Sequence, residues 1–504
     1  MPTETILPIG PKTSGPHETP FTLPGKPGEF PNLETQKDAG QKAFELNLDR
    51  SIYGTLAEIG AGQEVARWFF RVGGAAGTIA KTMSAYDMQI SDTIYGPAKR
   101  YVSRERLTKM LEKEFDLLRQ RLGKNRGSAS RFFAFANTVA TRSFRGKSDG
   151  RGWLGIRFQH ETGEAPSDVI IHARLTDEEV LQQQDALGLL GVNLIFGATK
   201  LFADPEHLIL SLMDNLGTAR VEVDMIETSG PAFAEVDNRV LALKLVEHGL
   251  TKAAMLTPEG KVVQPSEVLY GKPVLLERGL FHPPSQVHVD MLESAQKHLW
   301  QDPQAGDQEP VVLLEMNLKH QPENKTLSPE DFLTRADHLA SLGHPVMVSN
   351  YYRHFRVADY LFRATNERVA MVMGISGVAQ LFEEKYYTDL NGGILESFGR
   401  MFKNDLVLYA YPTKNTITGE LETAESLRVA PHLRHLYSHL LQNGKIVSLH
   451  DHELSHTPRH TEAISETNEA FCQGLDQISI ADLMPSTEEV PGEDASALIH
   501  RSSN

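Results

Sequence analysis

With 504 residues, the chain is long enough for roughly three domains and a large buried core. Its 66 acidic residues exceed its 50 basic ones, and the formal charge of −16 argues against a groove that follows the phosphates of long nucleic acids. No apolar run approaches the roughly 20 residues of a membrane span, and no charged-then-apolar leader begins the chain, so we expect a cytoplasmic protein without a membrane partner.

Both ends of the chain have the composition of flexible tails. Residues 1–44 are rich in Pro, Gly and Thr without an apolar period, and residues 451–504 are acidic and similarly irregular. Four histidines near the second tail suggest a metal site, but they lie on no definite element, so we interpret them as solvated and expect no metal: His450, His452, His456 and His460. The only cysteine, Cys472, excludes a disulfide within one chain.

Between the tails, helical segments alternate with short apolar strands. Residues 106–122 place apolar side chains close to helical spacing, and segments such as DVIIHARL, KPVLLERG, PVVLLEMNL and DLVLYAYP read as buried strands. This alternation predicts the α/β class, with parallel sheets covered by helices. We expect two α/β domains, residues 45–204 and 272–450, joined by an α/β segment at 205–271.

The first domain contains a glycine-rich stretch, LAEIGAGQEVARWFFRVGGAAG, at residues 56–77. From Ala57 and Glu58 through Gly62 and Gly74 to Gly96, the spacing resembles, without gaps, the pattern of the CinA C-terminal domain family, the nicotinamide mononucleotide deamidases. The glycines equally suit close helix–sheet packing.

The resemblance implies that this domain has lost its chemistry. Where the family has a nucleophilic serine and a lysine, this chain has Ile59 and Ser91, and only Tyr86 of the expected group remains. An isoleucine cannot attack a carbonyl, so we expect no deamidase activity. The domain could still bind a nucleotide or serve dimerisation, and we expect a homo-oligomer. In the segment that follows, Asp237 begins a polar cluster that predicts a helix N-cap.

The second domain opens with a strand, a turn and a helix at residues 272–299. A helix start offers unpaired N–H groups to phosphates, and a histidine there can donate to the same oxygens. The order Gly279, Phe281, Pro283, Ser285 and His288 resembles the first-strand motif of the nucleotidyltransferase superfamily that includes nicotinate and nicotinamide mononucleotide adenylyltransferases. The alternative is an ordinary Gly/Pro turn with a surface histidine.

Later segments extend this resemblance unevenly. A strand ending at Lys319 precedes a helix that begins near Ser328, as in the family. Ser376 stands where the family has an aspartate. The late ATP-phosphate motif is not recognisable, and its nearest candidate contains Ser426 and Arg428.

The resemblance implies a Rossmann-like nucleotidyltransferase domain. In such enzymes the phosphate of a mononucleotide attacks the α-phosphate of ATP, and Mg²⁺ neutralises the charge. His288 would stabilise the reacting phosphates, Ser285 would donate a hydroxyl hydrogen bond, and the amides after Gly279 would cradle phosphate. Phe281 and Pro283 would complete the motif. Lys319 and Arg428 are further candidate phosphate partners, and Ser426 is a further candidate for binding the nucleotide. The alternatives are a solvated lysine at the strand end for Lys319 and a surface helix residue for Arg428.

Two functional hypotheses follow. The first is adenylyl transfer from ATP, with Mg²⁺, to nicotinate or nicotinamide mononucleotide, a step of NAD biosynthesis. The second is a catalytically inactive protein that keeps both folds to bind nucleotides or to act as a scaffold. The lost serine and lysine and the unclear late motif favour the second hypothesis, whereas the strand-turn-helix motif favours the first.

Overall fold

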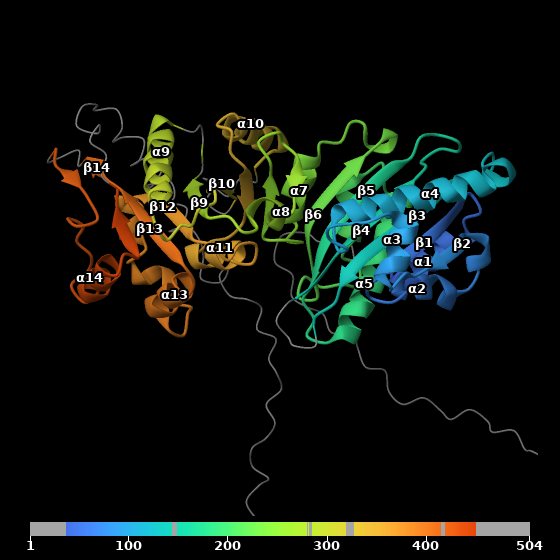
Figure 1. Cartoon of the computed structure of the whole chain (residues 1–504), viewed down its shortest axis with the longest axis horizontal. Coiled ribbons are helices and arrows are strands. Elements are labelled where there is room, and N and C mark those ends of the chain that lie inside the picture. Colours follow the sequence, from blue (N-terminus) through green and yellow to red (C-terminus); the bar gives the residue numbers. More distant parts are fainter. Residues whose placement is uncertain are drawn as a thin grey trace, which may run out of the picture. The chain divides into compact units, whose positions relative to one another are not determined.

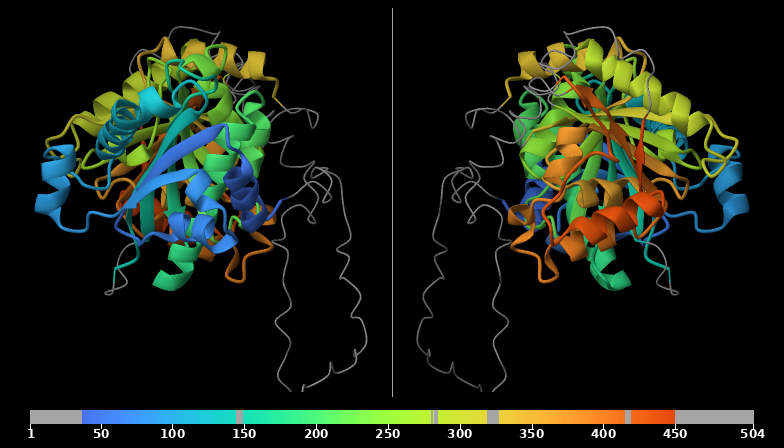
Figure 2. Two further views of the ribbon diagram at one scale, coloured as in Figure 1. Left: turned by 90° about the vertical axis from the view of Figure 1, so that its right-hand side faces the viewer. Right: turned by 90° about the vertical axis from the view of Figure 1, so that its left-hand side faces the viewer.

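The computed structural model describes residues 37–143, 149–279, 281, 285–318, 327–414 and 419–449. In this part of the chain the strands form a six-stranded sheet, an eight-stranded sheet and a two-stranded ribbon of β14 (Thr413–Lys414) and β15 (Leu421–Glu422). Helices pack against both large sheets (Figures 1 and 2), so the α/β prediction is confirmed.

The first sheet is mixed. Its strands run in the order β2 (Ile79–Met83), β1 (Ile52–Ile59), β3 (Arg131–Ala140), β4 (Gly150–Phe158), β5 (Ser167–Leu175) and β6 (Val221–Ser229). Strand β1 pairs in parallel with β2 and β3, whereas β3 to β6 pair antiparallel. The connections from β3 to β4 and from β4 to β5 are short, and short connections suit antiparallel neighbours. The prediction of parallel strands therefore holds for only half of this sheet.

Helices cover both faces of the first sheet. One core lies between the sheet and α1 (Ala39–Leu48), α2 (Glu64–Val72), α5 (Val180–Lys200) and α6 (Pro205–Ser211). On the other face lie α3 (Met88–Tyr95) and α4 (Arg104–Arg126), and the left-hand view of Figure 2 shows helices on either side of the blue to green strands. Helix α4 contains the predicted helix 106–122, and the Ser103 side chain caps it by accepting a hydrogen bond from the Arg106 amide.

The second sheet has the strand order of a doubly wound fold. The order is β16 (Ile446–Ser448), β13 (Leu406–Tyr411), β12 (Val369–Gly374), β9 (Val274–Gly279), β10 (Val311–Asn317), β11 (Val346–Ser349), β7 (Ala253–Leu256) and β8 (Val262–Val263). Strands β16 to β11 are parallel, and β7 and β8 add an antiparallel edge. Counted from β9, the parallel strands follow the order 6-5-4-1-2-3, so the chain reverses direction across the sheet between β9 and β12.

The helices change face at the same point. Helices α9 (Gln286–Trp300) and α10 (Pro329–Ala340) share a core with Leu275 on one face. Helices α11 (His354–Leu361), α12 (Ile375–Gln380), α13 (Gly393–Met401) and α14 (Arg434–Gln442) share a core with Leu276 on the other (Figure 1). Because side chains alternate along a strand, consecutive residues of β9 reach different helix layers.

The predicted connecting segment 205–271 is divided between the two sheets. Strand β6 completes the first sheet, and β7 and β8 join the second. Helix α7 (Asn238–Glu247) lies between them in the chain, and α8 (Pro265–Leu269) follows β8. The predicted N-cap is confirmed, because the Asp237 side chain accepts a hydrogen bond from the Arg239 amide at 2.9 Å.

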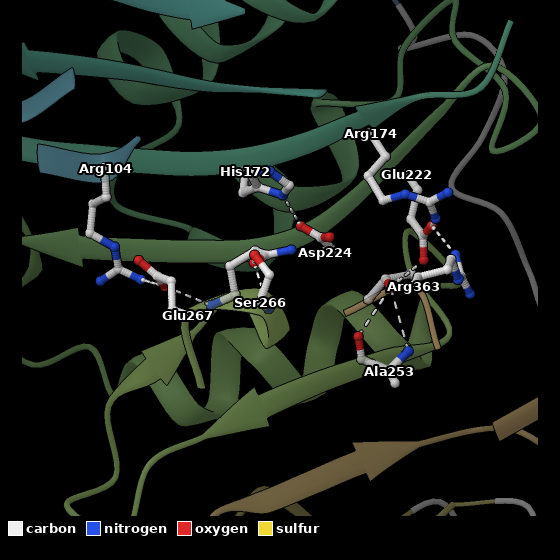
Figure 3. A network of polar contacts seen from close by, with 11 residues as sticks. Arg104, His172, Arg174, Glu222, Asp224, Ala253, Ser266, Glu267 and Arg363 are labelled. Atoms are coloured by element: carbon white, nitrogen blue, oxygen red, sulfur yellow. Dashed lines mark hydrogen bonds and ion pairs between the residues drawn. The ribbon is translucent and has the colours of Figure 1, made fainter. Parts of the chain in front are cut away.

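Polar contacts join elements of the two sheets (Figure 3). The Glu222 carboxylate on β6 accepts hydrogen bonds from Thr251 at 2.8 Å and Arg363 at 3.4 Å. Arg104 donates to Glu267 at 3.2 Å. Beside them, the buried His172 and Asp224 side chains lie 2.6 Å apart. Within the described ranges, no helix is long and apolar enough to cross a membrane.

Candidate functional site

A pocket of about 80 Å³ opens beside the carboxyl ends of β9 and β12, where the doubly wound sheet reverses. Folds of this class bind ligands in the crevice at that point. Strand β9 contributes Leu276, Arg278 and Gly279, and β12 contributes residues 371–373. The start of α11 and parts of α12 and α13 complete the lining, so the pocket lies on the α11 face of the sheet.

Arg278 brings a buried positive charge to this pocket. Its side chain is only 5% exposed, and its Nη2 donates to the carbonyl of Tyr351. Its Nε lies 3.5 Å from Glu315 Oε2, an ion pair, and neither Nε nor Nη1 has a hydrogen-bond partner in the described part of the chain. Burial lowers the pKa of Arg278, against the opposing effect of Glu315, yet a guanidinium stays charged near neutrality. The Nη1 group is therefore a buried donor without a hydrogen-bond partner among the described residues.

Two neighbouring strands hold the surroundings of Arg278 in place. On β11, the Ser349 hydroxyl donates to Glu315 Oε1 at 2.5 Å. On β10, the Asn317 side-chain amide donates to the Tyr351 carbonyl at 2.6 Å. Because the same carbonyl accepts from Arg278, these bonds fix the direction in which the guanidinium points.

The start of α11 adds further polar groups. Arg353 is the N-cap residue, and its guanidinium pairs with Asp389. His354 follows as the first helical residue, and burial together with the Arg278 charge lowers the pKa of its imidazole to about 3. His354 is therefore neutral at physiological pH. Residues 352–354, at the start of α11, line the pocket, and a helix start carries the positive end of the helix dipole.

The remaining walls are aromatic and apolar. They include Tyr386, Tyr387, Met371, Met373 and Met401. The Tyr387 hydroxyl donates to the Leu381 carbonyl at 2.9 Å, and burial raises the pKa of Tyr387 to about 12. Flat rings and flexible methionines pack well against a planar ligand ring. The pocket thus combines a buried guanidinium with walls suited to a ring.

The structure places His288 on the opposite face of the sheet. Its Nδ1 lies 2.6 Å from Glu277 Oε1, a hydrogen bond, and its ring centroid lies 5.0 Å from that of Phe281. His288 is only 8% exposed, so the alternative of a surface histidine is wrong. Burial raises the pKa of Glu277, and the His288 bond opposes that rise. Ser285 is the N-cap residue of α9, although its side chain makes no capping hydrogen bond.

Among the predicted nucleotidyltransferase residues that the structure describes, Gly279 alone lines the pocket. Ser426 and Arg428 are exposed between β15 and α14, and the Ser426 hydroxyl bonds within its own turn to Thr423. Pro283 and Lys319 lie outside the described residues.

Sequence reasoning missed four residues at or behind the pocket: Arg278, Glu315, Arg353 and His354. Two of them carry a sequence signal, because a charged residue stands near the end of the apolar strands VLLERG and VVLLEMN. A charge in such a strand needs a partner or a ligand.

In the first sheet, the degenerate deamidase positions lie in different settings. Ile59 ends β1, Tyr86 is 64% exposed before α3, and Ser91 is buried within α3. The adjacent Glu58 carboxylate accepts hydrogen bonds from the Ala66 amide at 2.9 Å, the Val65 amide at 3.2 Å and the Asn137 side chain at 3.1 Å. The Glu58 carboxylate therefore accepts the hydrogen bonds that the amides at the start of α2 could otherwise donate to a ligand. Burial raises the pKa of Glu58 to about 7.

No family model matches the chain, and no curated protein matches it. Solved structures with similarity include the competence/damage-inducible protein CihA from Agrobacterium tumefaciens, at 15% identity and a TM-score of 0.23, which spans 32% of this chain and 94% of that one. A CinA superfamily protein from Enterobacter cloacae gives 13% identity and a TM-score of 0.25 over 34% and 100% of the two chains. A competence or damage-inducible protein from Enterobacter asburiae gives 13% and 0.24 over 32% and 99%.

Proposed function

We propose that the second sheet binds a mononucleotide in the pocket between β9 and β12. The observation that carries this proposal is the buried Arg278, which lines the pocket at the reversal point of a doubly wound sheet and whose Nη1 has no hydrogen-bond partner among the described residues. A phosphate oxygen satisfies such a donor in a charge-assisted bond. The tyrosine and methionine walls would hold the ring of the nucleotide.

Adenylyl transfer is the reaction that we propose for this site. An oxygen of the bound mononucleotide phosphate attacks the α-phosphorus of ATP, a new P–O bond forms, and the bond to the β-phosphate oxygen breaks to release pyrophosphate. Mg²⁺ carried on the ATP phosphates would neutralise their charge. Arg278 and the amides at the start of α11 would orient the attacking phosphate, and the neutral His354 would add a hydrogen bond without repelling Arg278.

Binding without catalysis is the second candidate, and the position of His288 favours it. The His288 ring is engaged by Glu277 and Phe281 on the α9 face, whereas the pocket lies on the α11 face. A histidine held in this way would need to leave Glu277 before it could reach a phosphate in the pocket.

Calorimetric titration with nicotinate or nicotinamide mononucleotide tests the binding, with Arg278→Met as the variant. Loss of a charge-assisted hydrogen bond should weaken binding by about tenfold to a hundredfold. The matched control is Arg356→Met, which changes an exposed arginine on α11 and should bind as the wild type does. A folded wild-type protein that binds neither mononucleotide would contradict the proposal.

Pyrophosphate release then separates the two candidates. Release from ATP and Mg²⁺ that requires the mononucleotide, and that falls steeply in His288→Ala, supports adenylyl transfer. Binding of the mononucleotide without release supports the non-catalytic alternative.

A further inference from the structure

We propose that Glu315 competes with the ligand phosphate for Arg278 and so sets both the affinity and the charge selectivity of the pocket. This inference rests on the proposed function, because it concerns the same anion at the same guanidinium. Glu315 does not line the pocket and would act through Arg278, so it is a positioning residue.

The pair between Glu315 and Arg278 is loose. Glu315 Oε2 and Arg278 Nε lie 3.5 Å apart, beyond the roughly 2.7–2.9 Å of a charge-assisted hydrogen bond. Neither atom has a hydrogen-bond partner within the described ranges. A ligand can therefore bind the guanidinium without breaking a short bond between Arg278 and the carboxylate.

The carboxylate itself is held in place. Glu315 is fully buried on β10, and Ser349 donates to its Oε1. The other charged groups near the pocket leave its charge uncompensated: Arg353 is already paired with Asp389, and His354 is neutral. Glu315 thus offsets part of the positive charge that Arg278 presents to an incoming anion.

A phosphate bound at Nη1 would bring a second negative charge close to Glu315. In a buried site, like charges repel with little screening by salt or water. The carboxylate therefore lowers the affinity of the pocket for anions while it holds Arg278. It does not lower the affinity for ligands that lack a phosphate. Replacing Glu315 by an uncharged residue of the same shape should raise anion affinity selectively, whereas simple damage to the fold would lower it.

The test is the affinity of Glu315→Gln for inorganic phosphate and nicotinamide mononucleotide, with nicotinamide riboside as the ligand that lacks the phosphate. Phosphate and mononucleotide should bind at least about tenfold more tightly than to the wild type, and the riboside should not gain. The matched control is Glu277→Gln, an equally buried glutamate on the adjacent strand that faces α9, which should leave the three affinities unchanged.

Unchanged or weaker mononucleotide binding by a folded Glu315→Gln would overturn the inference while leaving the proposed function intact. Failure of the wild type to bind either mononucleotide would instead remove the proposed function. Glu315→Asp guards against misfolding, because it keeps the charge but moves it away from Arg278. It should bind the mononucleotide with an affinity between those of the wild type and the glutamine variant, and an affinity equal to that of the wild type counts against the inference.

Discussion

Three glutamates near the carboxyl ends of parallel strands are fully buried, and each has different partners. Glu58 is bound by backbone amides, Glu277 by His288, and Glu315 by Ser349 with Arg278 nearby. Removing a carboxylate from water disfavours its charged form, and nearby hydrogen bonds or positive charges oppose that effect. The same residue type therefore serves as a helix cap, a histidine partner and a counter-ion.

Glu58 should make the stability of the protein depend on pH. Its pKa rises from 4.5 to about 7 on folding, so its contribution is fully present below pH 4.5 and is lost as pH increases through 7. The loss amounts to about 3 kcal/mol at most. Glu58→Gln should remove this dependence when the free energy of unfolding is measured by urea denaturation at pH 5 and pH 8. Glu112→Gln, at an exposed position on α4, should keep the pH dependence of the wild type.

At the scale of elements, helix α5 approaches α2 closely because of its glycines. A Cβ on Gly191 would lie 2.3 Å from Val65 Cγ2 on α2 and 3.1 Å from Phe135 Cζ on β3. Two carbon atoms that are not bonded to each other cannot approach to 2.3 Å, so the packing of α2 and β3 against α5 requires glycine at position 191.

Gly191→Ala should lower the free energy of unfolding by about 1–3 kcal/mol, because the added methyl overpacks a filled core. Gly123→Ala is the matched change in helix α4, where the nearest neighbour of the added carbon is Arg119 Cγ at 3.8 Å. It should raise stability by about 0.5–1 kcal/mol through lower chain entropy. Thermal unfolding of the two variants checks both signs, and equal effects would mean that the α2 contact does not limit residue 191.

Much of the fold at this scale follows from local pattern. The segments KPVLLERG and PVVLLEMNL are apolar enough to predict buried strands, and they became β9 and β10. Partners are harder to predict, because the residue that binds Arg278 through its carbonyl, Tyr351, lies 73 positions away. A different limit applied to His288, whose partners Glu277 and Phe281 are close in the sequence but lie with it on the α9 face of the sheet. The sequence predicted that His288 lies near the start of a helix. The alternation of side chains along β9 then determines that Glu277, and with it His288, lies on the α9 face of the sheet.

Across the described part of the molecule, one buried hydrophobic cluster contains residues of both large sheets. Trp153, Ile170 and Met225 of the first sheet belong to the same core as Leu256 and Val262 of the second. The Glu222 and Arg104 contacts lie alongside it. Elements that are packed in one hydrophobic core unfold cooperatively.

The two sheets should therefore unfold in one transition. Hydrogen exchange measured at increasing urea should show peptides from β3 and β9 losing protection at the same concentration. Separate midpoints for the two peptides would show that the shared core does not couple the sheets.

Strand β9 also restricts how the chain can change in length. Glu277 and Arg278 are consecutive and serve opposite faces, one binding His288 and the other lining the pocket. A single-residue insertion or deletion within β9 would exchange them, because side-chain direction alternates at every position. Such a frame change would put a carboxylate in the pocket and a guanidinium beside His288, inverting the charge that meets a ligand. Substitutions in β9 can change anion binding by small amounts. A single-residue insertion or deletion in β9 should abolish it.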